Sequence, residues 1–255
     1  PRELKGELGK YLVVFILMVA SIGFVSGFLV ADNSMLIAYN EGFEKYNIED
    51  GNFRTAEQVH KTQREEIEAL GVKLYDNYYV EEPLDNGSTM RFFKNRQQVD
   101  KVCLMKGELP AGTGEIAIDR MYADNNKLSV GDTLKSGKKT WKITGLVALS
   151  DYSALFQNNN DTMFDAIKFG VGIVTKEEFS SFNESQLTYD YVWKYNKKPK
   201  KEKEEKKRSE DFMEDIGKDI TLESFIPQYV NQAIHFTGDD MGSDEAMIIV
   251  LLYIV

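Results

Sequence analysis

The chain of 255 residues has a single cysteine, Cys103, and two histidines, His60 and His235. One cysteine cannot form an internal disulfide, so a disulfide-stapled scaffold is excluded. The histidines lie far apart in sequence, and no carboxylate spacing around them resembles a metal site, so we expect no metal and no cofactor. Cys103 lies in the strand-like segment VDKVCLM, and we expect it to be a small buried residue.

Positive charge is also scarce relative to negative charge. The chain has 31 Lys and Arg residues against 41 Asp and Glu residues, a net charge of −10. Nucleic-acid binding calls for clustered positive charge, so nucleic acid is not expected as a partner. The sequence contains no G-x-x-x-x-G-K-[ST] phosphate-binding motif, so we expect no ATPase activity in this chain.

A long apolar run is present near the beginning of the chain. Tyr11–Ala31 holds 21 residues without a charge, which as a helix would span roughly 31 Å, the thickness of a hydrocarbon core. A signal peptide is disfavoured because the run exceeds a usual signal core and ends in a poor cleavage site. A buried soluble helix would carry a polar stripe, so we predict a retained transmembrane helix.

A second apolar run, Ala246–Val255, begins near the other end and stops after ten residues. Because the chain also starts at Pro1 rather than Met, we expect it to be a fragment of a longer, multi-pass protein, with a second transmembrane helix cut short. The leader 1–10 carries Arg2, Lys5 and Lys10, which favours a cytoplasmic leader. Residues 32–245 would then form an extracellular domain.

The pattern of residues 32–245 predicts an α+β fold with a mixed sheet and helices at both membrane-proximal ends. Helices are expected over Thr55–Leu70, Arg120–Asn126 and Lys176–Phe182, through Met35, Tyr39 and Phe43 as an extension of the first span, through Phe212, Ile216 and Ile220, and through Tyr229, Val230, Ala233 and Ile234. Strands are expected over Val72–Val80, Ser88–Lys94, Val99–Met105, Glu115–Ile118, Asp132–Lys135, Trp141–Leu149, Phe169–Val174 and Leu187–Tyr195. The turn signal Asp85-Asn86-Gly87 predicts a hairpin before Ser88–Lys94.

One segment departs from the acidic composition. Lys197–Arg208 (KKPKKEKEEKKR) holds eight basic and three acidic residues. It has two interpretations: a solvated linker or exposed helix start, or a cationic arm that contacts anionic lipid headgroups or wall polymers. The sequence does not decide between them.

Three segments carry a family resemblance. They are GELPAGTGEIAIDRMYADNNKLSVGDTL from Gly107, KITGLVALSDYSALF from Lys142, and FGVGIVTKEEF from Phe169. With the start RELKGELGKY and the segment SMLIAYNEGFEKYNIEDGNF after the span, they resemble the extracellular domain of ABC-transporter permeases of the FtsX-like/MacB-like superfamily, in particular large permeases of Gram-positive bacteria. The resemblance covers roughly Arg2–Phe182 and omits the lysine-rich segment.

The resemblance implies a MacB periplasmic-core-like domain and a non-catalytic permease subunit in a cell membrane. Its implied partners are a cytoplasmic ABC ATPase, a second permease copy or half, the lipid bilayer, and a peptide, lipid or wall-associated molecule outside. Export, resistance to antimicrobial peptides and mechanotransmission remain open as its task. The alternative is a two-span sensor whose extracellular domain binds a ligand; an anchored adhesion protein fits less well because the chain returns to the membrane.

Few residues suggest a site. Gly23 and Gly27 form G-x-x-x-G inside the span, where another helix can approach closely, either one of the same protein or one from a second copy. Asp239-Asp240 and Asp244-Glu245 precede the second run and are interpreted as a solvated helix entry, with an ion or partner contact as the alternative. Asp151-Tyr152 could be an acid–phenol pair, but a polar cap on a strand is favoured because nothing nearby completes a nucleophile or base.

Overall fold

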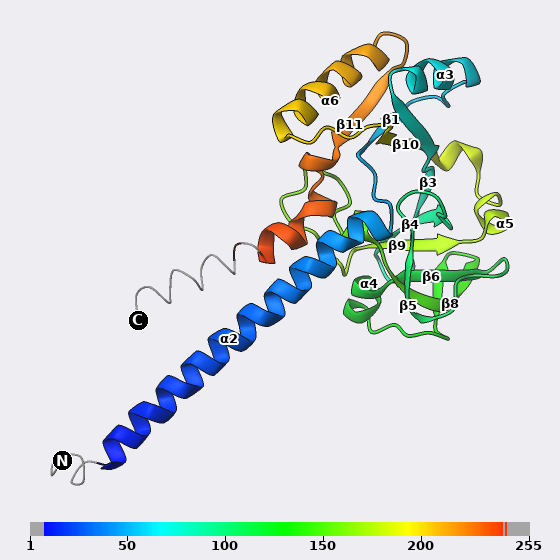
Figure 1. Cartoon of the computed structure of the whole chain (residues 1–255). Coiled ribbons are helices and arrows are strands. Elements are labelled where there is room, and N and C mark those ends of the chain that lie inside the picture. Colours follow the sequence, from blue (N-terminus) through cyan, green and yellow to red (C-terminus); the bar gives the residue numbers. More distant parts are fainter. Residues whose placement is uncertain (1–7, 242, 244–255) are drawn as a thin grey trace. The chain divides into compact units, whose positions relative to one another are not determined.

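The computed structural model describes residues 8–241 and 243 (Figure 1). The chain divides into two compact units. One contains the residues before Gly42 together with those after Phe236, and the other contains residues 42–236. The apolar segment Ala246–Val255, the pair Asp244-Glu245 and the leader before Leu8 lie outside the described residues.

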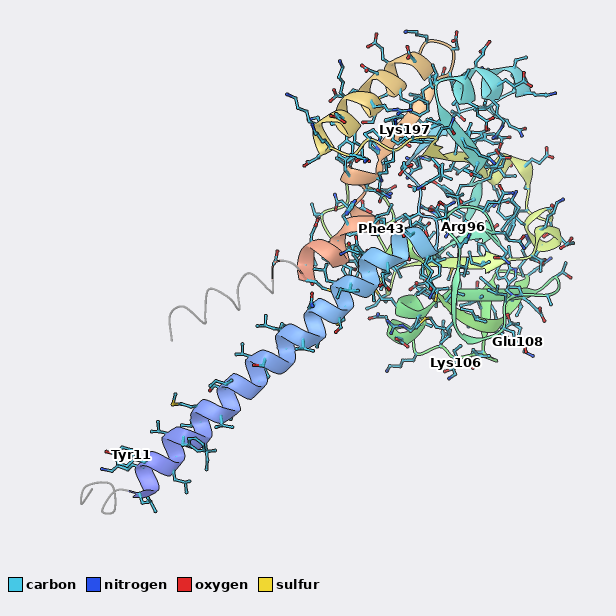
Figure 2. All side chains as sticks on the ribbon, viewed as in Figure 1. Tyr11, Phe43, Arg96, Lys106, Glu108 and Lys197 are labelled. Carbon is cyan, nitrogen blue, oxygen red and sulfur yellow. The ribbon has the colours of Figure 1, made fainter. Side chains whose placement is uncertain are left out.

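The first helix, α2 (Leu8–Lys45), contains the whole predicted span Tyr11–Ala31. Its 38 residues correspond to roughly 57 Å at 1.5 Å per residue, well over the 30 Å of a hydrocarbon core. The apolar window has a mean hydropathy of 2.6, and none of it is buried inside the protein. Figure 2 shows the side chains of this helix, with Tyr11 near its beginning. The helix therefore has the length and composition of a membrane span.

Within the described residues, eleven strands form one mixed sheet in residues 42–236. The strands are β1 (Gly51–Thr55), β2 (Val72–Asp76), β3 (Tyr79–Pro83), β4 (Thr89–Lys94), β5 (Cys103–Gly107), β6 (Glu115–Asp119), β7 (Thr133–Ser136), β8 (Lys139–Ala148), β9 (Phe169–Val174), β10 (Leu187–Tyr195) and β11 (Leu222–Pro227). Their order is β11-β1-β10-β3-β4-β9-β6-β8-β5, with β2 on β10 and β7 on β8. The pairs β4–β9 and β6–β8 are parallel, and the others are antiparallel.

The helices of this unit are short apart from α6. They are α3 (Lys61–Ala69), α4 (Arg120–Asn125), α5 (Lys176–Phe179) and α6 (Glu202–Ile216), with 3-10 turns at Ser150–Tyr152, Glu184–Gln186 and Gln228–Val230. Residues 232–241 are helical as well. Of the residues expected in this last helix, Ala233 and Ile234 lie in it, whereas Tyr229 and Val230 lie in the preceding 3-10 turn.

Two hydrophobic cores hold the sheet together. The larger core packs β4, β6, β8 and β9 around Phe92, Trp141 and Ile173. The smaller core packs β1, β2 and β10 against α3 and α6 and is centred on Trp193, whose ring contacts Phe212. Strand β10 belongs to both parts of the sheet, because its first residues pair with β3 and the following residues pair with β1 and β2.

Several expected boundaries are wrong, and two strands were missed. Thr55 ends β1 and the following helix begins only at Lys61, because alternate residues of β1 are buried between β10 and β11. The expected strand Val72–Val80 is two strands, since β2 and β3 pair with different parts of β10 and separate at Asn77. The strand expected from Val99 begins only at Cys103. Strands β1 and β11 were not predicted.

Two further expectations need correction. Cys103 is partly exposed rather than buried, because β5 is the last strand of the sheet and its residues face outward. Helix α6 begins at Glu202, inside the lysine-rich segment, and ends at Ile216, so Ile220 lies outside it. Two basic residues of that segment contact the rest of the fold: Lys198 lies 2.9 Å from Asp50, and Arg208 donates to Gly71 O at 3.1 Å as well as to Lys197 O in its own segment. An exposed helix start thus describes this segment better than a free arm.

Gly170 of β9 shows why this strand needs its glycines. A Cβ there would lie 2.6 Å from ring carbons of Tyr122, whose hydroxyl is fixed 2.7 Å from Ser88 Oγ. We expect Gly170→Ala to lower the free energy of unfolding of segment 42–236 by about 1–3 kcal/mol through overpacking. Chemical unfolding measures this. Gly112→Ala is the control, because a Cβ at Gly112 meets nothing within 4 Å; equal stability of the two variants would contradict the packing argument.

Candidate functional site

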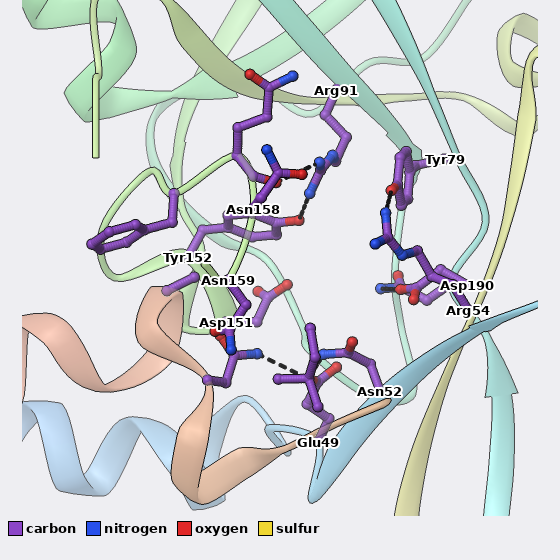
Figure 3. A pocket seen from close by; sticks show the side chains of 16 residues that line it. Glu49, Asn52, Arg54, Tyr79, Arg91, Asp151, Tyr152, Asn158, Asn159 and Asp190 are labelled. Atoms are coloured by element: carbon purple, nitrogen blue, oxygen red, sulfur yellow. Dashed lines mark hydrogen bonds between the residues drawn. The ribbon is translucent and has the colours of Figure 1, made fainter. Parts of the chain in front are cut away.

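A polar pocket lies within residues 42–236 and encloses about 590 Å³ of empty space, part of it open to solvent (Figure 3). Five strands contribute to it, namely β1, β3, β4, β10 and β11. The segment that follows β8 and the residues around the start of helix 232–241 also line it. Its walls carry amides, carboxylates, guanidinium groups and phenols. The lining residues are Glu49, Asn52, Arg54, Asn77, Tyr79, Arg91, Asp151, Tyr152, Phe156, Gln157, Asn158, Asn159, Asp190, Ile226, Asn231 and Ala233.

Strand register places the first part of this site. Asn52 and Arg54 are two residues apart on β1 and therefore point to the same face of the sheet. Arg54 stands directly opposite Asp190 of β10 in the antiparallel ladder. The Arg54 guanidinium donates from Nε to Ser224 Oγ at 2.9 Å and from Nη1 to Tyr79 OH at 3.1 Å. It thus joins the edge strand β11 to β3 across the pocket.

Arg91 of β4 is nearly fully buried and joins three segments. Its Nε and Nη2 donate to Glu81 Oε1 at 2.9 and 2.5 Å. Its Nη1 donates to Tyr152 OH at 2.7 Å, and Nη2 also reaches the Gln157 carbonyl at 2.8 Å. The guanidinium lies 4.3 Å from the centroid of the Tyr79 ring, within cation–π range. Arg91 therefore fixes the loop after β8 onto the sheet.

Arg96 and Asp151 form a bidentate ion pair next to the pocket. Arg96 donates from Nη1 and Nη2 to the two Asp151 oxygens at 2.5 and 2.9 Å, and both side chains are about 93% buried, with exposed fractions of 7% and 6%. Asp151 is held by Arg96 and Tyr152 by Arg91, which is not the arrangement of the disfavoured alternative, an acid–phenol pair. The two residues lie in the 3-10 turn that follows β8, as a polar cap would.

Three more carboxylates are buried around this pair. Glu49 Oε1 accepts from Asn52 Nδ2 at 2.6 Å, and Asp190 Oδ2 accepts from Asn77 Nδ2 at 3.2 Å. Asp100 Oδ1 accepts from the Glu49 amide at 2.8 Å, which holds the link between α2 and β1. Burial raises the pKa of Asp190 and of Asp100 to about 7, and it raises the pKa of Glu49 as well, with the Asp100 charge adding to the effect.

The lining set lacks the residues of the common nucleophile–base pairs. Among its sixteen residues there is no histidine, cysteine, serine, threonine or lysine, so Ser–His and Cys–His pairs have no candidate among them. In the described part of the chain, no group of three His, Cys, Asp or Glu side chains is arranged to hold a metal ion. What the pocket offers is charge, amide donors and aromatic faces.

The other residues singled out in the sequence lie outside this pocket. His60 precedes α3 and takes part in its capping box, and His235 stacks on Phe43 with ring centroids 6.1 Å apart. Asp239 and Asp240 lie in helix 232–241. Gly23 and Gly27 lie on α2, where a Cβ at either position would meet nothing within 4 Å.

Sequence reasoning found Asp151 and Tyr152 but missed most of the pocket. Its remaining polar residues come from positions 49–54, 77–91, 157–159, 190 and 231, which no local motif connects. One signal was available: Asp190 lies within the expected strand Leu187–Tyr195, among aromatic residues, and charged residues are rarely buried without a reason.

The buried carboxylates predict a pH dependence of stability. An Asp with a folded pKa of about 7 binds its proton more tightly in the folded state than in the unfolded chain. Its favourable contribution to the free energy of unfolding is therefore fully present below the unfolded pKa of about 3.9 and is lost as pH rises towards 7. We expect segment 42–236 to be more stable near pH 5 than near pH 8 in chemical unfolding.

Asp190→Asn isolates one carboxylate in this prediction. The amide resembles the protonated acid, so the variant should lose part of the decline between pH 5 and 8, and each pKa unit removed corresponds to about 1.4 kcal/mol. Glu65→Gln on the exposed face of α3 is the control and should leave the slope unchanged. A slope in Asp190→Asn identical to wild type would show that Asp190 is not protonated in the folded state.

Comparisons with known proteins bear on the fold. No protein-family model matches the chain, and no curated protein matches it. Among solved structures, it is similar to the periplasmic region of MacB from Actinobacillus actinomycetemcomitans, with 11% identity over 68% of this chain and 86% of that one and a TM-score of 0.37. It is also similar to the extracellular domain of the noncanonic ABC-type transporter YknZ from Gram-positive bacteria, with 8% identity over 68% and 98% and a TM-score of 0.34.

The expected fold class, a mixed α/β domain after an apolar helix, is confirmed by the strand order of the sheet and by α2. Identities of 11% and 8% transfer no residue roles to this chain.

Proposed function

We propose that this chain is part of the permease subunit of an ABC transporter, in which a separate cytoplasmic ATPase drives movement of the extracellular domain. Residues 11–31 cross the membrane, residues 32–245 form the extracellular domain, and residues 246–255 begin a second span. The protein does no chemistry itself and works in the cell membrane of a Gram-positive bacterium. Export, resistance to antimicrobial peptides and mechanotransmission are the tasks open to it.

The observation that carries this proposal is the unbroken helix α2. It runs from the apolar window to Lys45, and β1 begins only six residues later, at Gly51. Because only residues 46–50 separate the helix from the sheet, displacement of the span would reach the domain without a long linker. A tethered binding module would need no such short link.

The short link between α2 and β1 is tied firmly to the domain. Asn47 O accepts from the Asp100 amide, and Tyr46 O accepts from the Lys101 amide at 2.9 Å. The amide of Asp50 donates to Trp193 O at 2.8 Å, and the Asp50 carboxylate accepts from the Tyr195 amide at 2.8 Å. Movement of the helix end would therefore be passed directly to β10, the strand shared by both cores.

The second candidate is a sensor whose extracellular domain binds a ligand. The polar pocket favours it, because a pre-formed cavity with unpaired charges suits a small molecule and has no evident use in a purely mechanical element. The two functions differ in their cytoplasmic partner, which is an ABC ATPase for a permease and a kinase or response protein for a sensor.

Copurification from the membrane tests this distinction. The complete protein that contains this chain would be affinity-purified in mild detergent, with an untagged strain as control, and its partners identified by mass spectrometry. A stoichiometric ABC ATPase is the expected result. Recovery without an ATPase, in company with a kinase or response protein, would replace the permease by the sensor.

The glycines of the span give a second test. We propose that Gly23 and Gly27 form a face against which another transmembrane helix packs, either of the same subunit or of a second copy. Gly27→Leu should weaken this helix association, because the larger side chain keeps the backbones apart. Helix cross-linking in the membrane measures it. Val25→Leu, two residues away and so on the opposite face, is the matched control; unchanged assembly of Gly27→Leu would refute the packing role.

A further inference from the structure

The charges that line the pocket fall into two groups. Arg91 and Asp151 are neutralised by ion pairs, with Glu81 and Arg96 respectively. The other three, Arg54, Glu49 and Asp190, make no ion pair within 4.0 Å among the described residues, although all three line the same cavity (Figure 3). A pocket with one unpaired cation and two unpaired anions suits a ligand that carries both charges.

Arg54 provides the cationic side. Its hydrogen-bond partners, Ser224 Oγ and Tyr79 OH, are neutral oxygens, and Nη2 has no hydrogen-bond partner among the described residues. A guanidinium in this state favours a carboxylate, which it can bind through two parallel N–H···O bonds. The free nitrogen of Arg54 therefore marks the position for a ligand carboxylate.

Asp190 and Glu49 provide the anionic side. Both are more than nine-tenths buried, with exposed fractions of 7% and 2%, and their hydrogen-bond donors are the neutral amides of Asn77, Asn52 and Asn231. Burial disfavours the charged carboxylates and raises both pKa values; at Asp190 it outweighs the opposing effect of the nearby arginines, and at Glu49 the Asp100 charge adds to it. An ammonium group placed between them would restore the charged form and make three hydrogen bonds.

The two sides lie close enough to bind one small molecule. Arg54 and Asp190 are cross-strand partners in an antiparallel ladder, where opposite Cβ atoms are about 4.5–5.5 Å apart. Such adjacent opposite charges match a carboxylate and an ammonium on a single carbon atom. The rest of the lining is largely amides and phenols, and its apolar members are Phe156, Ile226 and Ala233.

We propose that this pocket binds a free α-amino acid with an apolar side chain. Arg54 holds the carboxylate, Asp190 and Glu49 hold the ammonium group, and Phe156, Ile226 and Ala233 receive the side chain. This inference does not depend on the proposed function, because a permease domain and a sensor domain could equally well carry such a site.

Ligand analogues test the charge requirement on the intact protein. Isothermal titration calorimetry of the complete protein in detergent would compare L-leucine with 3-methylbutylamine, which lacks the carboxylate, and with 4-methylpentanoate, which lacks the ammonium group. We expect L-leucine to bind with a Kd of about 1 mM or below, and each analogue to bind roughly tenfold more weakly or worse. Glycine should bind more weakly than L-leucine, because it cannot fill the apolar wall.

Variants connect the binding to the pocket. Arg54→Gln should weaken the binding of L-leucine roughly tenfold or more but leave the binding of 3-methylbutylamine unchanged. Asp190→Asn should also weaken the binding of L-leucine but leave the binding of 4-methylpentanoate unchanged. Arg120→Gln, on the exposed face of α4 and outside the pocket, is the control and should bind as wild type does. Circular dichroism confirms that each variant is folded.

Two results would overturn the proposal. The first is no heat or thermal shift with any of these probes in the folded wild-type protein at about ten times the expected Kd. The second is equal binding of L-leucine and its single-charge analogues, which would show that Arg54 and Asp190 do not bind the two charges of one ligand. Both readouts are taken on the wild-type chain, so they stand even where a variant fails to fold, and neither depends on whether an ATPase copurifies.

Discussion

The bidentate ion pair between Arg96 and Asp151 holds the centre of the domain formed by residues 42–236. It lies beside Asp100, whose carboxylate accepts from the Glu49 amide and so fixes the link between α2 and β1. Removing one partner of a buried pair costs about 3–5 kcal/mol, because the other charge is left without compensation. This pair therefore stabilises the turn after β8, the link from α2 to β1 and the adjacent side of the pocket.

The fold class could be predicted because most strands here carry their own signal. The hairpin around Asp85–Gly87 is recognisable from its turn residues, and β9 and β10 from their β-branched and aromatic residues. The strands β1 and β11 could not be predicted in this way, because each is short and becomes a strand only through the other and through β10. Tertiary pairing, not local propensity, decided those segments.

The pocket was less predictable than the fold. Asp151 and Tyr152 attracted attention as neighbours in sequence, yet their partners are Arg96 and Arg91, which lie more than fifty residues earlier. Which charges neutralise each other is set by the sheet order, and a single sequence does not contain that order explicitly. The lysine-rich segment illustrates the same limit, because its composition suggests an exposed arm while Lys198 in fact binds the buried Asp50.

The position of β1 in the sheet has a consequence for how the chain acquires its structure. The Arg54 side chain of β1 donates a hydrogen bond to Ser224 of β11, 170 residues later in the chain. The first strand of the domain therefore cannot complete its pairing until β11, one of its last elements, has been synthesised. Contacts so distant along the chain make folding slow, because a long loop must close before they form. During synthesis, β1 therefore stays an open strand edge, and such edges invite aggregation. A nascent domain of this topology reaches its native pairing only after β11 has been synthesised.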